Sequence, residues 1–303
     1  MSGFFQALAA KLAERWVTFL VVPGAMFVAA VWTAAHLGQA HAVDWHALTR
    51  YASATTAVLA RQPAATQALL AVVVLVATIG ASLAVQALAG ITRLIWLGLW
   101  PRPVAAIRRW QVGRRAARWN RLLELRRRLE REYPRQSRSD AQQLRINTSA
   151  DRLNRLSWIA PGRPTWMGDR INSVERIALD RYRLDLRFAW PRLWLLLPET
   201  SRAEITTANT AFAAAVAVGT WAWPYLALGI AWWPAALIGA GAGVTGWARA
   251  RSAVGELAAI TEAALDLHGR ALAVALGVAE PGTAGPLSLA EGEKITALVR
   301  KGR

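Results

Sequence analysis

Residues 66–91 read TQALLAVVVLVATIGASLAVQALAGI, an apolar run without a charged side chain. A bilayer core is crossed by about 20 apolar helical residues, so this run is long enough to span a membrane. The whole chain of 303 residues is 54% hydrophobic, above the balance usual for soluble proteins. The sequence therefore predicts an all-α fold: a polytopic membrane protein with about four transmembrane helices and a helical, arginine-rich cytoplasmic domain.

The amino-terminal part of the chain supplies two of these predicted spans. We expect an amphipathic helix over residues 1–15, a first span over 16–36 and a second span over 66–92. Residues 37–65 between the spans are expected to form an outer loop. A cleaved signal peptide in place of the first span is an open alternative, although its apolar part would be only about 7 to 15 residues long.

Residues 206–248 form another apolar stretch, which is too long for one span and suits a hairpin of two. Pro224 and Gly229 supply turn residues near its midpoint. Indoles prefer the membrane interface, where the ring lies in lipid and the N–H meets the headgroups. Four tryptophans near the turn are therefore predicted interface anchors: Trp221, Trp223, Trp232 and Trp233. A re-entrant loop is the alternative to a full hairpin.

The distribution of arginine sets the predicted orientation. Of 33 arginines, 24 lie between residues 101 and 206, and only 11 acidic residues accompany them, a net charge of +13. Basic segments stay in the cytoplasm, so we place residues 93–205 there as a helical domain, together with carboxy-terminal helices over 249–303. The predicted location is the bacterial cytoplasmic membrane, crossed several times, with both termini in the cytoplasm.

The arginine-rich domain also suggests partners. Guanidinium groups make forked contacts with phosphate, so anionic membrane lipids are the first expected partner, and a soluble cytoplasmic protein is a second. Nucleic acid is not an expected partner, because the positive-inside rule explains most of this charge. The predicted residues for headgroup or partner binding are Arg126, Arg127, Arg128, Arg181, Arg183 and Arg192.

Glycine spacing predicts close helix packing inside the membrane. Gly239, Gly243 and Gly246 recur at the small-residue spacing that lets two helices approach, and Gly80 offers a weaker case in the second span. The letters of residues 241–246 also match a dinucleotide-binding fingerprint. That motif requires a preceding strand, whereas these residues lie inside a predicted span, so we interpret them as packing residues.

No set of residues predicts catalysis, and the chain has no cysteine. The acids between Asp169 and Asp185 alternate with arginines, which indicates a solvated helical face rather than acids converging on a metal. Four outer-loop residues could offer zinc ligands, but their spacing matches no zinc site: His36, His41, Asp44 and His46. We therefore expect no catalytic, metal-binding or cofactor-binding residues and no cofactor.

Three local features of the cytoplasmic part are also predicted. A helix over residues 105–133 is expected, and it could continue directly from the second span. The apolar stretch 186–197 is broken by Pro191, so it is expected at the membrane surface or beneath the spans. Ser288 and Glu291 have the spacing of a capping box, which would begin a short terminal helix.

One region resembles other proteins. The segments RPTWMGDRI (163–171), with Glu175 after it, DRYRLD (180–185) and WPRLWLLLP (190–198) resemble a segment of uncharacterised multi-pass membrane proteins of actinobacteria. The similar region covers about 36 of the 303 residues. Those proteins usually carry Asn in place of Asp169 and Gly in place of Arg183. The resemblance implies a membrane fold, and it implies neither an activity nor a functional residue.

Three functional hypotheses follow. The first is a homo-oligomeric membrane protein, such as a pore or membrane effector, with a cytoplasmic assembly or sensing domain. The absence of charged residues from the predicted spans argues against an ion route through them. The alternative is a membrane anchor or scaffold that binds an anionic partner or lipid headgroups through its arginine-rich domain. A lipid-processing enzyme is the third, although no convergent acid, base or nucleophile supports it.

Overall fold

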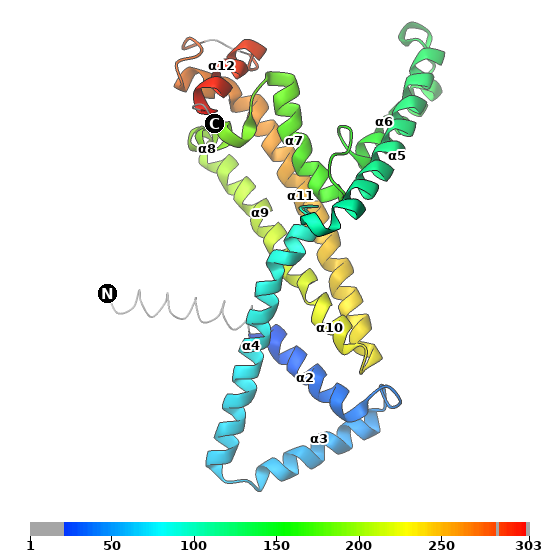
Figure 1. Ribbon diagram of the computed structural model, residues 1–303, viewed down its shortest axis with the longest axis vertical. Coiled ribbons are helices and arrows are strands. Elements are labelled where there is room, and N and C mark those ends of the chain that lie inside the picture. Colours follow the sequence, from blue (N-terminus) through cyan, green and yellow to red (C-terminus); the bar gives the residue numbers. More distant parts are fainter. Residues whose placement is uncertain (1–20, 283–284, 301–303) are drawn as a thin grey trace, which may run out of the picture. The chain divides into compact units, whose positions relative to one another are not determined.

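The structure is a computed structural model that describes residues 21–282 and 285–300. These described residues form helices and turns but no strand, which confirms the all-α prediction (Figure 1). The chain divides into two compact units. The apolar unit holds the residues up to Thr92 together with Ala214–Ala248, and the arginine-rich unit holds Arg93–Ala213 and the residues from Arg249 onward.

The helices of both units follow one another along the chain with short connections. In chain order they are α2 (Val22–Leu37), α3 (Trp45–Ala60), α4 (Ala64–Trp96), α5 (Ala105–Glu132), α6 (Asp140–Leu156), α7 (Trp166–Tyr182), α8 (Leu186–Leu196), α9 (Glu199–Thr220), α10 (Ala222–Leu228), α11 (Trp233–Ala275) and α12 (Leu289–Arg300). Short 3-10 turns, η2 (Arg102–Val104) and η3 (Arg135–Ser137), flank α5. Helices α9 and α11 each contribute residues to both units.

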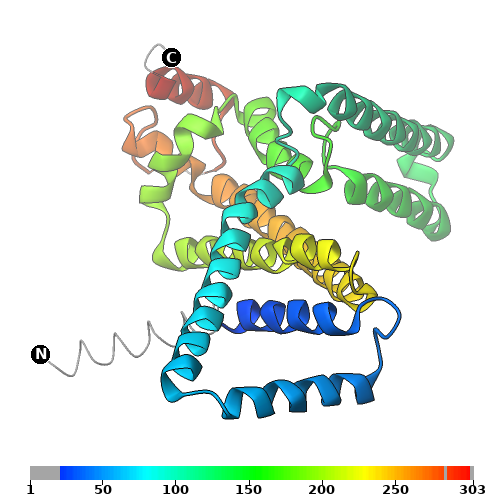
Figure 2. The same ribbon diagram turned by 60° about the horizontal axis from the view of Figure 1, so that its bottom comes forward.

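Within the apolar unit, α2 and α3 run in opposite directions and α3 leads into α4 (Figure 2). Segment 37–65, expected to be a loop, is therefore largely helical. The Asp44 carboxylate accepts a hydrogen bond from the Ala47 N–H at 2.8 Å and begins α3 as its N-cap. Several alanines then favour continuation of the helix, and this local signal outweighs the low hydropathy of the segment.

Two stretches are long and apolar enough to cross a membrane: Ala64–Trp96, which is α4, and Glu199–Leu228, which joins α9 and α10. Helix α2 is a shorter apolar helix. The predicted helix over 1–15 and the start of the predicted span over 16–36 lie outside the described residues. Of the four predicted spans, the structure thus supplies two helices of sufficient length and composition.

The predicted hairpin over 206–248 contains a reversal of the chain at residues 229–232, after the short helix α10. Its second arm does not end at residue 248. Helix α11 is 43 residues long in total, and it continues through Arg249 and Arg251 to Ala275. Arginine is a good helix former, so a change from apolar to charged side chains does not interrupt the backbone.

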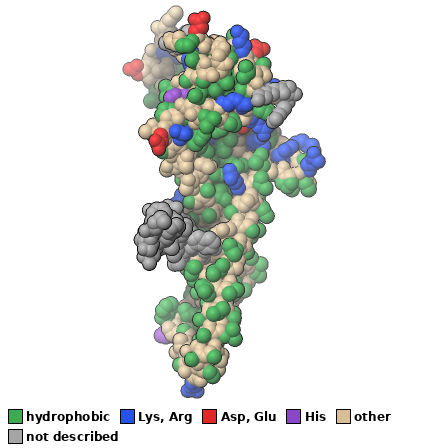
Figure 3. Space-filling model, turned by 90° about the vertical axis from the view of Figure 1, so that its left-hand side faces the viewer, with side chains coloured by type: hydrophobic (Ala, Val, Ile, Leu, Met, Phe, Trp, Pro, Cys, Tyr) green, Lys and Arg blue, Asp and Glu red, His purple; other side chains and the backbone are tan. Residues whose placement is uncertain are grey.

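Helix α4 carries an extensive exposed apolar surface. Its exposed large side chains include Leu69, Leu70, Val72, Val73, Val74, Leu75, Val76, Leu83 and Leu88. Figure 3 shows hydrophobic side chains over this part of the apolar unit. The core helix of a soluble protein would bury such side chains against its neighbours.

Close helix contacts within the apolar unit occur at glycines. A Cβ atom added to Gly246 would lie 2.5 Å from the Cα of Gly219, and one added to Gly239 would lie 2.9 Å from the Leu226 nitrogen. Only glycine allows these backbones to approach so closely. The Gly24 position is similar, because a Cβ there would overlap the carbonyl oxygen of Thr78.

The other two predicted packing glycines differ from each other. A Cβ at Gly243 would lie 3.2 Å from the Cβ of Ala222, a tight contact, whereas a Cβ at Gly80 would meet no atom within 4 Å. Gly80 thus makes no close helix contact within the described chain. The residues that match the dinucleotide-binding fingerprint lie inside α11, with helix on both sides.

The arginine-rich unit has two parts. Helices α5 and α6 pack against each other as an antiparallel pair, seen in both ribbon views (Figures 1 and 2). Helices α7, α8 and α12, together with parts of α9 and α11, surround the core. Its largest fully buried apolar side chains are Leu184, Leu193, Leu197, Leu272 and Ile295.

Two local predictions are wrong. Pro191 does not break α8, although it lies inside the helix as the sixth of its 11 residues. The helix buries Leu186, Ala189 and Leu193, and this packing outweighs the main-chain hydrogen bond that proline cannot donate. Helix α5 does not continue from α4. Gly98 adopts a φ of 65°, and Pro101 lacks the N–H that a continuous helix would require.

The predicted capping box at α12 is confirmed. The Glu291 carboxylate accepts the Ser288 N–H at 2.8 Å, and the Glu291 N–H donates to the Ser288 hydroxyl at 3.3 Å. Glu291 also pairs with Arg270 at 2.8 Å. These contacts, led by the backbone hydrogen bond from Ser288, lower the pKa of Glu291.

Candidate functional site

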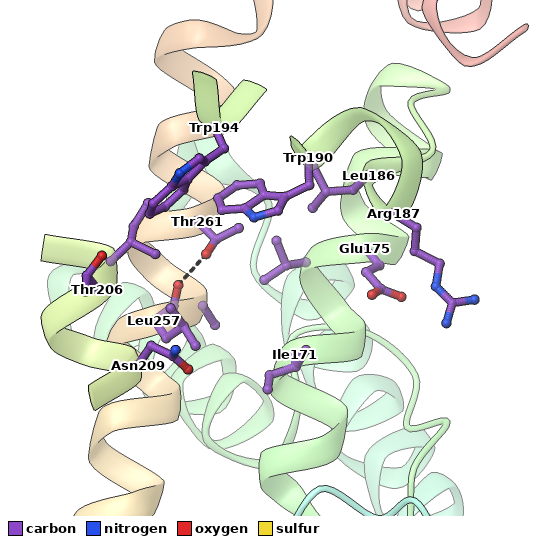
Figure 4. Close-up of a pocket in the computed structure, with 13 residues that line it drawn as sticks. Ile171, Glu175, Leu186, Arg187, Trp190, Trp194, Thr206, Asn209, Leu257 and Thr261 are labelled. Atoms are coloured by element: carbon purple, nitrogen blue, oxygen red, sulfur yellow. Dashed lines mark hydrogen bonds between the residues drawn. The ribbon is translucent and has the colours of Figure 1, made fainter. Parts of the chain in front are cut away.

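An open hollow of about 550 Å³ lies between α7, α8, α9 and α11 of the arginine-rich unit (Figure 4). Its walls are mainly apolar. They consist of Ile171 and Val174 from α7, Leu186, Trp190 and Trp194 from α8, Ile205 from α9, and Leu257 and Ala258 from α11.

Helical spacing explains why the two indoles meet. Trp190 and Trp194 lie four residues apart, so both project from one face of α8. Their ring centroids lie 6.1 Å apart with a tilt of 47°. Leu193, on the neighbouring face, is fully buried and fixes the helix in the core. The indole pair therefore forms one rigid apolar wall of the hollow.

Polar side chains from several helices also line the hollow: Glu175, Arg187, Thr206, Asn209 and Thr261. Figure 4 shows the indole rings on one side and Glu175 and Arg187 together on the other. Glu175 and Arg187 form no ion pair with any described residue, whereas the Thr261 hydroxyl donates to the Leu257 carbonyl at 2.7 Å. A mainly apolar hollow with a few polar groups is the usual form of a site for a small amphiphilic ligand.

A buried ion pair supports the loop before α7. Asp169 is 2% exposed, and its carboxylate pairs with Arg115 of α5 at 2.7 Å. The other carboxylate oxygen accepts the N–H groups of Gly162 at 2.8 Å and Arg163 at 2.6 Å. The sequence pattern predicts a solvated position for Asp169, and this prediction is wrong. Asp169 links α5 to the loop, because a buried carboxylate is stable where four hydrogen bonds satisfy it.

Arg170 is also buried rather than solvated. It is 8% exposed, and its guanidinium carbon lies 3.9 Å from the ring centroid of Trp158 and 4.6 Å from that of Trp166. Arg251 stacks on Trp166 as well, at 3.9 Å. Burial, followed by the charge of Arg251, lowers the pKa of Arg170 to about 10. Arg170 remains a cation at neutral pH, so this cluster is a stacked cation–aromatic support.

The predicted headgroup-binding arginines fall into two groups, which the structure does not gather into one site. On α5, Arg126 pairs with Glu130 at 2.9 Å and Arg128 with Glu124 at 3.4 Å, each at i,i+4 spacing. Arg127 is exposed. Two of these three guanidinium groups therefore already have a carboxylate partner.

The second group lies around α7 and α8. Arg181 lies 3.9 Å from Asp266, and the Arg192 guanidinium donates to the Phe188 carbonyl at 2.7 Å. Arg183 is the residue that ends α7, and its φ of 53° lies in the left-handed region that glycine favours. Arg183 therefore has a structural role in the turn, whatever its side chain binds.

Three of the four predicted interface tryptophans make side-chain contacts within the protein, and none of the four is fully buried. The Trp223 N–H donates to the Thr92 hydroxyl at 3.1 Å, and the Trp232 N–H donates to the Ala42 carbonyl at 2.8 Å. Trp221 packs on the ring of Phe27, with centroids 5.8 Å apart. Trp233 is 44% exposed. Two of the four indole N–H groups are thus satisfied within the protein.

The possible outer-loop zinc ligands do not converge within the described chain. Asp44 caps α3, and its hydrogen bond from Ala47 lowers its pKa. The His36 ring lies 4.5 Å from the ring of Trp32 and 5.3 Å from that of Tyr51, between centroids. Asp44 and His36 thus make local structural contacts.

Comparison with known proteins adds no identity to this geometry: no family model, no curated protein and no solved structure matches the chain. The site must therefore be argued from its own residues. Sequence reasoning missed the hollow, because its walls come from four helices that are separated along the chain. The one local signal was the i,i+4 spacing of Trp190 and Trp194.

Proposed function

We propose that this chain is a multi-pass protein of the bacterial cytoplasmic membrane whose arginine-rich unit binds an amphiphilic lipid. The observation that carries the proposal is the hollow beside Trp190 and Trp194, which combines apolar walls with a charged edge. Its volume of about 550 Å³ lies within the usual range for ligand pockets, about 300–1,000 Å³. This proposal develops the membrane-anchor hypothesis, in which the arginine-rich domain binds lipid headgroups. Here the domain also binds the acyl chain of the lipid.

The path of α9 favours a membrane lipid over a soluble ligand. Ile205, Thr206 and Asn209 line the hollow, and the apolar span-length stretch Glu199–Leu228 contains all three. These three residues lie within the first 11 of the 30 residues of this stretch, and a helix rises about 1.5 Å per residue. The hollow therefore lies toward the amino-terminal end of the proposed span, where acyl chains and headgroups meet. A lipid could therefore enter the hollow without crossing bulk water.

The proposed topology has four crossings with both termini in the cytoplasm. The α4 stretch and the α9–α10 stretch would be two of the spans. The other two would be the predicted first span over 16–36 and the uncharged start of α11 over 233–248. The arginine block over 93–205 supports a cytoplasmic position for the arginine-rich unit.

Photocrosslinking tests the proposal. Purified protein in maltoside micelles is labelled with a phosphatidylglycerol that carries a diazirine in its acyl chain, and the modified peptides are mapped by mass spectrometry. We expect labels on the peptides that contain Trp190, Trp194, Ile205 and Leu257. Labels confined to α4 and α10 would indicate only the surrounding lipid and would contradict the proposal.

A matched pair of substitutions on α9 sharpens this test. Asn209→Trp fills the hollow from its edge, whereas Thr207→Trp places the same side chain on α9 outside the lining. Both residues are exposed, so neither change disturbs the core. Labelling in the hollow should be lost in N209W and retained in T207W. Equal labelling in both variants would be evidence against the hollow as the binding site.

A homo-oligomeric pore or effector is the second candidate. The observation that favours it is the open face of α4, where the many exposed apolar side chains and the uncovered Gly80 leave room for another helix. Native mass spectrometry with the lipid mass subtracted gives the subunit count. A ring of four or more subunits would support the pore, and a monomer or dimer would favour the lipid-binding anchor.

A further inference from the structure

Two smaller hollows lie next to one another beside the apolar hollow within the arginine-rich unit. A hollow of about 200 Å³ shares Ile171, Glu175 and Arg187 with the apolar hollow, and its lining also includes Arg163. Arg163 in turn belongs to a third hollow of about 520 Å³. The shared residues make the three hollows neighbours along one surface, so a single extended ligand could occupy more than one of them.

The third hollow is strongly basic. Its lining consists of Arg108, Arg109, Val112 and Gly113 of α5 with Gly162 and Arg163 of the loop before α7, and it includes no acid. Across all three linings, Glu175 is the one carboxylate against four arginines. The charge therefore changes from nearly neutral beside Trp190 to positive beside α5.

The arginines of this third hollow have no acidic partner in the described part of the chain. Arg108, Arg109 and Arg163 form no ion pair with any described carboxylate and donate no side-chain hydrogen bond to a described residue. The nearest acid to the loop, Asp169, is buried and already bonded to Arg115 and to the loop N–H groups. Asp169 thus holds Arg163 in place without neutralising its guanidinium.

Helix α5 itself suits a membrane interface. Ile107 and Trp110 flank the arginine pair in the sequence and are 54% and 59% exposed. At about 100° per residue, both side chains project from faces of α5 that do not line the hollow. Exposed apolar and indole side chains on a helix that also carries arginines are the combination that enters the headgroup region of a bilayer.

We propose that Arg108, Arg109 and Arg163 bind the phosphate group of the lipid whose acyl chain occupies the hollow beside Trp190. This inference rests on the proposed lipid-binding function and assigns the headgroup class as an anionic phosphate. Planar guanidinium groups hold phosphate through paired N–H donors, which lysine cannot reproduce. Arg187, which lines both the apolar and the connecting hollow, contributes positive charge between chain and headgroup.

The test compares two photoactivatable lipids with identical diazirine acyl chains, phosphatidylglycerol and diacylglycerol, in maltoside micelles. In the wild-type chain, phosphatidylglycerol should label the apolar hollow at least about tenfold more efficiently, the equivalent of one charge-assisted contact. In the R108Q/R109Q/R163Q variant this ratio should fall to about twofold or less, with diacylglycerol labelling unchanged.

The control removes the same charge elsewhere in the arginine-rich unit. Arg118 and Arg121 of α5 and Arg135 of η3 are exposed and pair with no described carboxylate, so R118Q/R121Q/R135Q should retain the tenfold preference. All six side chains are at the surface or half-buried, so both variants should fold. A retained preference in R108Q/R109Q/R163Q, or an equal loss in both variants, would overturn the assignment.

Two further outcomes have separate meanings. If neither lipid labels the hollow, the proposed lipid-binding function fails; if both label it equally in the wild type, only the phosphate assignment fails. Inorganic phosphate identifies the source of the anion. It should displace phosphatidylglycerol weakly and only at millimolar concentrations, and displacement at concentrations equal to the lipid would assign the site to free phosphate instead.

Discussion

The ion pair between Asp169 and Arg115 gives the sharpest stability prediction. The side chains are 3% and 17% exposed, and the carboxylate also accepts two N–H groups from the loop that carries Arg163. Removing one partner of a buried pair costs about 3–5 kcal/mol. We expect the lower end for Asp169→Ala, about 3 kcal/mol, because water can reach part of Arg115.

Thermal unfolding in detergent, followed by tryptophan fluorescence, measures this effect. At about 2–4 °C per kcal/mol for a unit of this size, D169A should lower Tm by roughly 6–12 °C. Asp151→Ala on α6 is the control, since Asp151 is exposed, and it should change stability by less than about 0.5 kcal/mol. If D169A does not fold, Asp169→Asn is measured instead. It keeps one acceptor oxygen, so it should fold with a Tm below that of the wild type. A Tm of D169A within about 2 °C of wild type would refute the reasoning.

Three further predictions concern single residues. Arg183→Gly should raise stability by about 0.5–1 kcal/mol, because glycine adopts the φ of 53° without strain; a lower Tm would contradict this. Gly246→Ala should destabilise by about 1–3 kcal/mol through overlap with Gly219, whereas Gly80→Ala, with open space around it, should be neutral or stabilising, both measured by thermal unfolding. Burial raises the pKa of Glu262 above its usual value, so the stability that its neutral form contributes is present at acid pH and is lost as pH rises through the raised pKa. Glu262→Gln should flatten this fall in Tm with rising pH, and an unchanged pH profile would count against it.

The features of the fold that depend on local residue types could be predicted from the sequence. The all-α class, the long apolar helix over 66–92, the reversal of the chain within 206–248 and the capping box at Ser288 follow from local residue types. Helix α3 was missed because one capping aspartate, Asp44, and a series of alanines decide it, and neither raises hydropathy.

The site could not be predicted, because burial of charge depends on tertiary contacts. Asp169 and Arg170 lie in a sequence of alternating charges that is typical of a solvated face. The partners that bury them, Arg115 and Trp158, are distant in sequence or outside the helix. Likewise, the triplet of arginines over 126–128 is prominent in the sequence, but two of the three are paired along their own helix.

The lipid-binding proposal is tested most directly by a cryo-electron microscopy structure of the protein in nanodiscs of bacterial lipid. The proposal predicts elongated density between Trp190 and Leu257 that continues toward Arg163 and ends in a compact headgroup beside Arg108 and Arg109. An apolar hollow that contains only water or protein side chains, with lipid confined to the outer surface of the spans, would contradict it.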